Sequence, residues 1–464
     1  MPTSLKWLFL LTTINGLIKW PNSLQNIRVL IHIRKIGGDS MEVRQFDDLG
    51  YTLTTIKTDK FKTNLISVSF QSEINRDTVT KRSLLPYVLR GATEKYPSKK
   101  ALNTYLESLY GASLSTTVEK RGKTHNIKFY LSLANEKFLG HQEPLLEEGV
   151  ALLKEVILKP LLVDGAFKEQ VVDIEKRLLK EYIESIYDDK VSYSLQKLVE
   201  NMCQGETFSI NSIGYADDLA EINGKNLMKT YEEMLNNNQV SVAVVGDIDP
   251  QHVYEIFSKQ FNFAHRSVNQ EVIDHEDKVI QEVKVIKEVQ DISQGKLNIG
   301  YRTHTRIDDD DYLPLLVFNG IFGGYAHSKL FMNVREKESL CYYCASRLDN
   351  YKGVMYVYSG IESQNYDKAL KIIDEQLKDM VSGNFSEKEI DLAKKSLINS
   401  KLESMDQASG MMAHEALNKL LKHPLSVEEW VAAVNAVTAE QVVAVAKKIK
   451  EDTVFFLTGK EVAE

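Results

Sequence analysis

Hydrophobic and small polar residues alternate in two stretches that lie far apart in the chain. Residues 64–70 read NLISVSF and residues 297–301 read LNIGY, and a period of two is typical of strands with one buried face. Each stretch leads through a polar turn to an apolar helical run, near Ser83 and near Tyr312 respectively. This shared order predicts an internal duplication. The alternative is that two unrelated α+β domains share it by chance.

The ends of the two predicted halves match as well. Residues 220–223 open a predicted helix that leads to a strand at 242–247. Residues 433–435 open another predicted helix, which leads to a strand at 455–460.

Helical spacing dominates the middle of the first half. Apolar residues recur every three or four positions over 145–157, and Pro160 ends the run. A second helix, from about Ala166, is predicted to place four apolar residues along one face: Val171, Leu178, Tyr182 and Ile186. The sequence therefore predicts an α+β fold of two homologous halves, each an antiparallel sheet with packed helices.

Composition divides the chain into four segments. Residues 1–40 hold five basic residues, one acidic residue and an apolar run shorter than the about 20 residues of a membrane span. Gly-Gly-Asp just before Met41 can be encoded by a ribosome-binding sequence, so we predict that 1–40 is a mistranslated leader or a disordered extension; the alternative is a membrane or export segment. Charged residues 265–294 are a predicted connector between the halves, 41–264 and 295–464.

The overall composition narrows the class of protein. With 464 residues, 43% of them hydrophobic, the chain can bury full cores and is neither disordered nor a disulfide scaffold. A net charge of -8 argues against binding nucleic acid by bulk electrostatics. The three cysteines, Cys203, Cys341 and Cys344, suit a reducing compartment, so we expect a cytoplasmic protein. We also expect it to bind neither nucleic acid nor membrane.

Familiar catalytic motifs are missing from the sequence. No two of the ten histidines are four residues apart, as a helical zinc motif requires. His414-Glu415 begins such a pattern, but Asn418 stands in place of the second ligand, so His414 is predicted to lie on a helix surface. Residues 320–324 (GIFGG) lack the ending of a phosphate-binding loop, and no serine nucleophile elbow is present. We therefore predict no metal and no cofactor.

One C-x-x-C pair, Cys341 and Cys344, lies in a stretch that reads as a strand. Residues three apart in a regular strand point to opposite faces. The pair is therefore predicted to serve packing, in preference to a redox or metal role.

The second half resembles the non-metal half of the insulinase/pitrilysin (inverzincin) peptidases. The resemblance rests on residues 320–324, on HSKLF at 327–331 and on REKESLCY at 335–342, and it spans nearly all of 41–464. It implies α+β halves that pair to enclose a chamber for unfolded peptide, with H-x-x-E-H on a helix of the first half.

This sequence departs from the family at that motif. The five positions fall on residues 83–87 (SLLPY), so Ser83 and Tyr87 replace the histidines and Pro86 replaces the general base. The helix at 175–182 keeps acidic residues near the third ligand position, but one carboxylate cannot hold Zn²⁺. The chain should not be a zinc peptidase by itself.

The narrower resemblance is to the non-catalytic member of a bacterial pair associated with 5-aminopentanol modification of elongation factor P. It rests on residues 84–87, 105–113 and 183–190, and it implies a heterodimer with a zinc-bearing homologue that binds peptide. In such pairs the roles of gripping substrate near the partner's metal would fall on Arg335 and Tyr342. The structural alternative is a salt bridge of Arg335 beside a core Tyr342. The functional alternatives are a zinc endopeptidase active alone and a non-proteolytic assembly factor.

Overall fold

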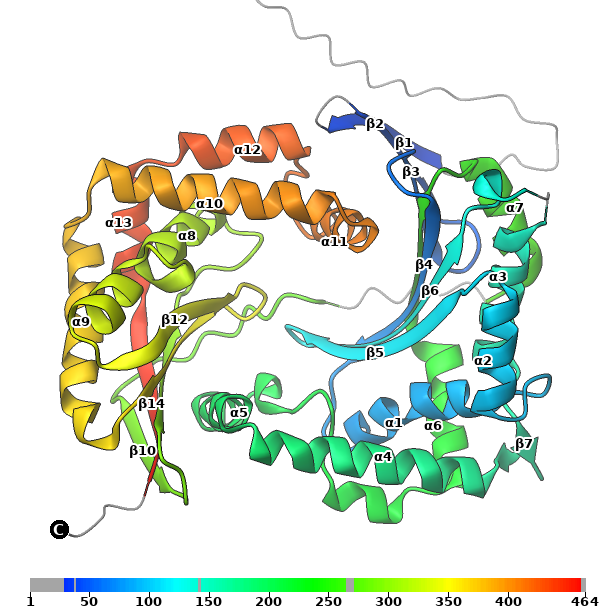
Figure 1. Ribbon diagram of the computed structural model, residues 1–464, viewed down its shortest axis with the longest axis horizontal. Helices are drawn as coiled ribbons and strands as arrows, with labels where there is room; N and C mark the ends of the chain where they lie inside the picture. The colour runs from blue at the N-terminus through cyan, green and yellow to red at the C-terminus, as the bar shows by residue number, and fades with distance from the viewer. Residues whose placement is uncertain (1–28, 37–38, 141–142, 264–270, 460–464) are drawn as a thin grey trace, which may run out of the picture.

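Two large sheets, each with its own helices, organise the part of the chain that the structure describes (Figure 1). The structure is a computed structural model, and it describes residues 29–36, 39–140, 143–263 and 271–459. The predicted leader lies largely outside these residues. Within it, Val29–Ile36 forms strand β1, which pairs antiparallel with β2 (Asp39–Phe46), and residues 39 and 40 begin β2.

The first sheet has the strand order β1-β2-β3-β9-β4-β6-β5. Its further strands are β3 (Thr52–Lys57), β4 (Thr63–Glu73), β5 (Ser113–Arg121), β6 (Thr124–Ala134) and β9 (Gln239–Gly246). Its half contains helices α1 (Val79–Gly91), α2 (Lys99–Ser108), α3 (Leu145–Leu158), α4 (Glu169–Asp188), α5 (Lys190–Met202), α6 (Gly224–Asn237) and α7 (Pro250–Gln260). A small hairpin joins β7 (Leu162–Val163) to β8 (Ala166–Phe167).

The second sheet has the strand order β10-β14-β11-β13-β12. Its strands are β10 (Lys284–Val289), β11 (Gly295–Arg302), β12 (Cys341–Asp349), β13 (Val354–Ile361) and β14 (Lys450–Thr458). Its helices are α8 (Tyr312–Asn319), α9 (Tyr366–Ser382), α10 (Glu387–Met405), α11 (Ala408–Asn418), α12 (Val427–Ala436) and α13 (Ala439–Lys448). Two π-helical segments, Gly320–Gly324 and Phe331–Lys337, follow α8.

The two sheets repeat one topology. In each, one pair is parallel, β3 with β9 and β10 with β14. The next strand, β4 or β11, is antiparallel to both of its neighbours. The predicted strands at 64–70 and 297–301 lie in these equivalent strands, β4 and β11. Strand β10 lies within the predicted connector 265–294 and belongs to the second sheet.

The predicted match at the ends of the halves needs one correction. Residues 433–435 do not open the helix before β14, because they belong to the end of α12. The last helix begins at Ala439, where Thr438 and Gln441 cap its N-terminus reciprocally. Thr438 is therefore the counterpart of the N-cap Asn223 that opens α6.

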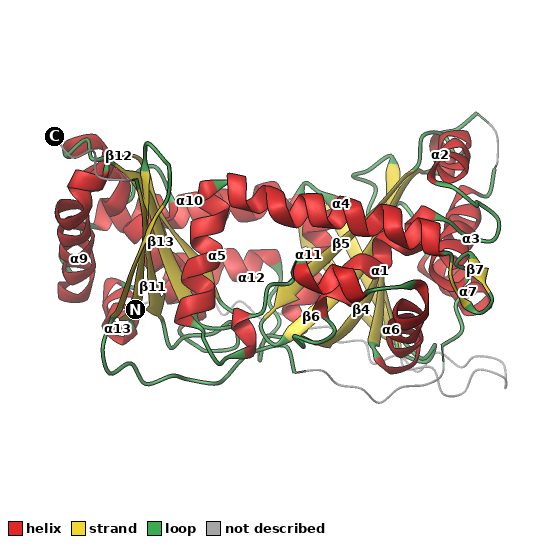
Figure 2. Cartoon of the chain, turned by 90° about the horizontal axis from the view of Figure 1, so that it is seen from below, coloured by secondary structure: helices red, strands yellow, loops and turns green. Residues whose placement is uncertain are grey.

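One helix of each half packs against the sheet of the other half. Helix α5 packs on β11 and β14, and α11 packs on β9. Both helices lie between the sheets in Figure 1, and Figure 2 shows α4 running along the molecule toward α5. Two apolar clusters mix residues of both halves and join them. The exchange fixes how the halves face one another.

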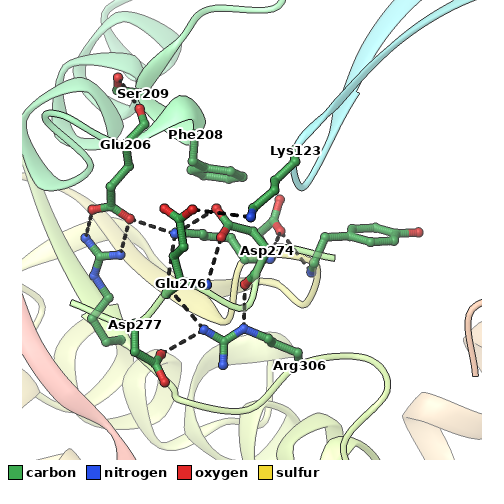
Figure 3. A network of polar contacts seen from close by, with 12 residues as sticks. Lys123, Glu206, Phe208, Ser209, Asp274, Glu276, Asp277 and Arg306 are labelled. Carbon is green, nitrogen blue, oxygen red and sulfur yellow. Dashed lines mark hydrogen bonds and ion pairs between the residues drawn. The ribbon is translucent and has the colours of Figure 1, made fainter. Parts of the chain in front are cut away.

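A buried ionic network also ties the halves together (Figure 3). Lys352 is fully buried, and its ammonium lies 2.7 Å from a Glu206 oxygen and 2.8 Å from an Asp274 oxygen. The guanidinium of Arg302 contacts Glu206 at 2.7 Å and Asp452 at 2.8 Å. Burial raises the pKa of Glu206, but hydrogen bonds from Arg302 and Lys352 outweigh it and hold that pKa below its ordinary value. The network joins the end of α5, the connector and the second sheet.

Candidate functional site

Helix α1 carries the three positions predicted to replace a zinc motif. Ser83 is fully buried, and its hydroxyl donates to the carbonyl oxygen of Ser212 at 2.7 Å. Pro86 is buried within the helix, and Tyr87 is half-buried one turn after Ser83. Burial, with smaller effects of Tyr182 and Glu175, raises the pKa of Tyr87. None of the three side chains is a good zinc ligand at neutral pH.

An acidic residue of α4 remains beside these positions. Glu175 is buried, and its carboxylate lies 2.7 Å from the ammonium of Lys99, the first residue of α2. A side chain at Gly91 would come within 3.4 Å of the same carboxylate, so α1 packs closely on α4 here. Lys99 therefore supplies the positive charge that a metal would supply in an intact zinc site. No local pattern in the sequence points to this lysine, because it is distant in the chain from Glu175.

Replacing Lys99 with methionine is expected to lower the free energy of unfolding by about 1–3 kcal/mol, because it leaves the buried Glu175 carboxylate without its cation. Urea unfolding at pH 7 measures the loss. The double variant Lys99→Met/Glu175→Gln is expected to recover most of it. Equal losses in the single and double variants would show that the ion pair is not the cause.

The histidine closest in sequence to α1 is not available to a metal. His125, in β6, is buried; its Nδ1 accepts from Arg82 Nε at 3.1 Å and its Nε2 donates to the carbonyl oxygen of Ser212 at 2.9 Å. Burial and the Arg82 charge lower the pKa of His125 to about 3. Burial also lowers the pKa of Arg82 to about 10. Across the described residues, no group of three or more His, Cys, Asp or Glu side chains could hold a metal ion.

His414 does not lie on a helix surface, as its sequence context predicted. It is buried in α11, where Lys401 Nζ lies 2.9 Å from Nδ1 and Asn418 Nδ2 lies 3.3 Å from Nε2. The prediction was wrong because α11 is covered on one side by α10 and on another by the first sheet.

The apolar row predicted along α4 is not the face that the helix buries. The residues that α4 buries are Val172, Glu175 and Leu179. Ile174, Leu178 and Tyr182, spaced four residues apart, form an outer row whose exposed fractions are 50%, 42% and 53%. We call these three residues the α4 row. Tyr182 affects the pKa of Tyr87, so the α4 row adjoins Tyr87 of α1, one of the positions predicted to replace a zinc motif.

Two of the clefts between the halves are lined by strands of the large sheets. One, of about 320 Å³, separates the first sheet from α11, and the small polar residues Ser67 and Ser69 of β4 line it. The other, of about 290 Å³, lies between α5 and the second sheet. The polar positions of the alternating strand thus face the space between the halves.

Arg335 and Tyr342 are both exposed, on neighbouring segments of the second half. Arg335 lies in the π-helical segment Phe331–Lys337, which packs on β12, and its guanidinium stacks 4.5 Å from the Phe331 ring. Its Nε lies 3.5 Å from Glu336. Tyr342, in β12, is 81% exposed, so it is not the core residue of the structural alternative.

The prediction that Cys341 and Cys344 point to opposite faces is wrong. The register of β12 against β13 shifts between them, and the thiol of Cys344 hydrogen-bonds to the sulfur of Cys341. Because of this irregularity, two residues that are three positions apart in β12 lie on the same face of the sheet.

Comparison with known proteins places the chain in a family. A family model described as "Peptidase M16 inactive domain" matches residues 221–397. "Probable inactive metalloprotease YmfF" of Bacillus subtilis (strain 168) is 41% identical over 412 residues, which cover 89% of this chain and 96% of that protein. The chain belongs to the M16 peptidase family. The predicted insulinase-type resemblance is confirmed, and this M16 chain is a homologue of an inactive metalloprotease.

A second relative and a solved structure are also similar to the chain. "Uncharacterized zinc protease YmxG" of Bacillus subtilis (strain 168) is 22% identical, over 81% of this chain and 92% of that protein. The crystal structure of a conserved protein from Enterococcus faecalis V583 has a TM-score of 0.84 and 34% identity, over 89% of this chain and 98% of that one. The predicted α+β fold is confirmed. Among the described helices, none combines the length and apolar character needed to cross a membrane.

Proposed function

We propose that this M16 chain is a non-catalytic subunit that pairs with a zinc-bearing M16 homologue and forms one wall of a peptide-binding chamber. It acts in the cytoplasm in association with 5-aminopentanol modification of elongation factor P. The observation that carries the pairing is the α4 row, an apolar row left in solvent beside the degenerate zinc positions. Exposed apolar rows of this kind favour contact with another protein or peptide.

The residues proposed to hold substrate are free to reach it. Arg335 and Tyr342 are exposed and lie on adjoining segments. A guanidinium can hold a peptide carbonyl or carboxylate, and a phenol can donate to an oxyanion. The Arg335 contact with Glu336 is long and exposed, so little is lost when the arginine turns to a peptide.

Co-expression with the H-x-x-E-H homologue from the same genome tests the pairing. A stable complex on size-exclusion chromatography is expected, and Leu178→Glu in the α4 row should weaken it more than Lys180→Glu, a change at an exposed position on the same helix. Separate elution of the two chains would contradict the pairing. A complex that forms but cleaves no peptide would favour the non-proteolytic assembly factor over a role in proteolysis.

Arg335→Ala is expected to lower peptide turnover by the complex about 10- to 100-fold, because a hydrogen bond to a charged donor is lost. Initial rates of a quenched fluorescent peptide measure it. Lys337→Ala removes an exposed cation from the same π-helical segment and is the matched control. Equal rates for Arg335→Ala and the unmodified complex would remove Arg335 from the substrate site.

A further inference from the structure

A local irregularity in β12 brings two thiols together. Cys341 lies opposite Ile361 of β13 and Cys344 lies opposite Ser359, so three steps along β12 match two steps along β13. Both cysteines therefore face the same side of the sheet, and the extra residue is taken up between them at Tyr342 and Tyr343. Two residues of strand span about 6.6 Å, within the Cα separation that a disulfide bridges.

The two sulfur atoms differ in access. Cys344 is 1% exposed, whereas Cys341 is only partly buried at the start of β12, which is the edge strand of its sheet. Cys203 is fully buried in the cluster between α5 and the second sheet, and burial raises its pKa to about 12. The chain thus has one accessible thiol, a second directly behind it, and a third that is buried elsewhere.

The surroundings of Cys341 favour its thiolate. The hydrogen bond from Cys344 is the main cause, and the Ser359 hydroxyl and the charge of Arg335 add to it; together they outweigh burial and lower the pKa of Cys341 to about 7. The pKa of Cys344 is raised, first by its hydrogen bond with Cys341 and then by burial. A thiolate is the nucleophile in disulfide exchange, and an accessible one with a protonated neighbour is the arrangement of an attacking and a resolving cysteine.

We propose that Cys341 and Cys344 form a redox dithiol that low-molecular-weight disulfides, such as oxidised glutathione, convert to an internal disulfide. The Cys341 thiolate attacks one sulfur of the glutathione disulfide, forms a mixed disulfide and releases one glutathione thiolate. The Cys344 thiol then loses its proton to solvent and attacks Cys341 Sγ, which releases the second glutathione thiolate. Two protein thiols are oxidised and one glutathione disulfide is reduced to two glutathiones.

Packing and metal binding account for the pair less well. Two cysteines that serve only packing need no contact with solvent, yet Cys341 is partly exposed and its pKa is lowered. No third metal-binding side chain completes a site with the two cysteines in the described part of the chain. Tyr342 and Tyr343 lie between them, so the disulfide closes a ring through the backbone of both residues, and the exposed Tyr342 side chain projects from that ring. The proposal does not depend on the proposed function, because its readout is thiol chemistry on the purified chain.

The test uses the full chain, reduced, freed of reductant and exposed to oxidised glutathione at pH 7.5. Trypsin releases residues 338–347 as one peptide with both cysteines. In wild type this peptide is expected to lose the mass of two hydrogens and to carry no glutathione, and dithiothreitol should reverse the change. Cys203 should remain reactive to maleimide only after unfolding.

Single variants establish the order of attack. Cys344→Ser is expected to retain one glutathione on Cys341, because the resolving thiol is missing. Cys341→Ser is expected to react at least about tenfold more slowly, because Cys344 is buried. Stable glutathione adducts on the wild-type peptide, an unmodified wild-type peptide, or equal rates in the two variants would each overturn the proposal. The wild-type outcomes decide it even if a variant fails to fold.

Discussion

Lys352→Met is expected to lower the free energy of unfolding by about 3–5 kcal/mol, because breaking a buried ion pair leaves its partner charge uncompensated. Lys352 is fully buried and holds Glu206 and Asp274 at once. Glu206 keeps its contact with Arg302, but the Asp274 carboxylate loses its cation, since Arg306 bonds only to the backbone carbonyl of Asp274. Urea unfolding followed by circular dichroism measures the loss.

Two further variants isolate the cause. Lys352→Met/Asp274→Asn is expected to recover part of the stability, because it removes the orphaned charge. Lys137→Met removes an exposed partner of Asp247 and is expected to cost less than about 1 kcal/mol. A Lys352→Met loss as small as that of Lys137→Met would mean that water reaches the network and that it does not fix the two halves.

The sequence predicted those parts of the fold that a local hydrophobic period identifies. Alternation over 64–70 and 297–301 marked the central strands β4 and β11, because each carries apolar residues on one face and small polar residues on the other. The same duplication appears in the equivalent order of β3-β9-β4-β6-β5 in the first sheet and β10-β14-β11-β13-β12 in the second. The family resemblance implies a helix at residues 83–87, and the structure places α1 there.

Features that depend on tertiary contacts escaped prediction. Helix α4 has apolar residues on more than one face, so its spacing could not tell which face is buried; the structure buries Val172 and Leu179 and exposes the α4 row. The irregularity in β12 involves no Gly or Pro that would indicate it in the sequence. The C-x-x-C spacing therefore predicted a regular strand, with the two cysteines on opposite faces. The ionic network draws Glu206, Asp274 and Lys352 from distant segments, and no local pattern connects them.

Internal polar contacts stabilise the region around α1. It holds a lysine-paired glutamate, a hydroxyl bonded to a carbonyl, and the buried Arg82–His125 pair. These contacts make the region a structural element. Its behaviour under acid therefore reports on folding.

Acidification is expected to destabilise the chain through His125 by about 2 kcal/mol at pH 5 and about 3 kcal/mol at pH 4, relative to pH 7.5. The pKa of His125 is about 3 in the folded chain, below the ordinary 6.5, because burial and the Arg82 charge disfavour the imidazolium. Between those values the unfolded chain binds a proton that the folded chain does not, so this stability is fully present above pH 6.5 and declines as pH falls toward 3. Unfolding free energies measured from pH 7.5 to 4 test the slope.

His125→Gln separates this contribution from that of the carboxylates, which titrate in the same acid range. A glutamine amide can accept from Arg82 and donate to the Ser212 carbonyl but does not titrate, so the variant is expected to lose stability less steeply below pH 6, by up to about 1.4 kcal/mol per pH unit. His252→Gln shows what removing an exposed histidine does. Parallel curves for wild type and His125→Gln would mean that the buried imidazole accepts a proton without unfolding. In that case Arg82 would have to move away from the ring, because both Nδ1 and its guanidinium would then be donors.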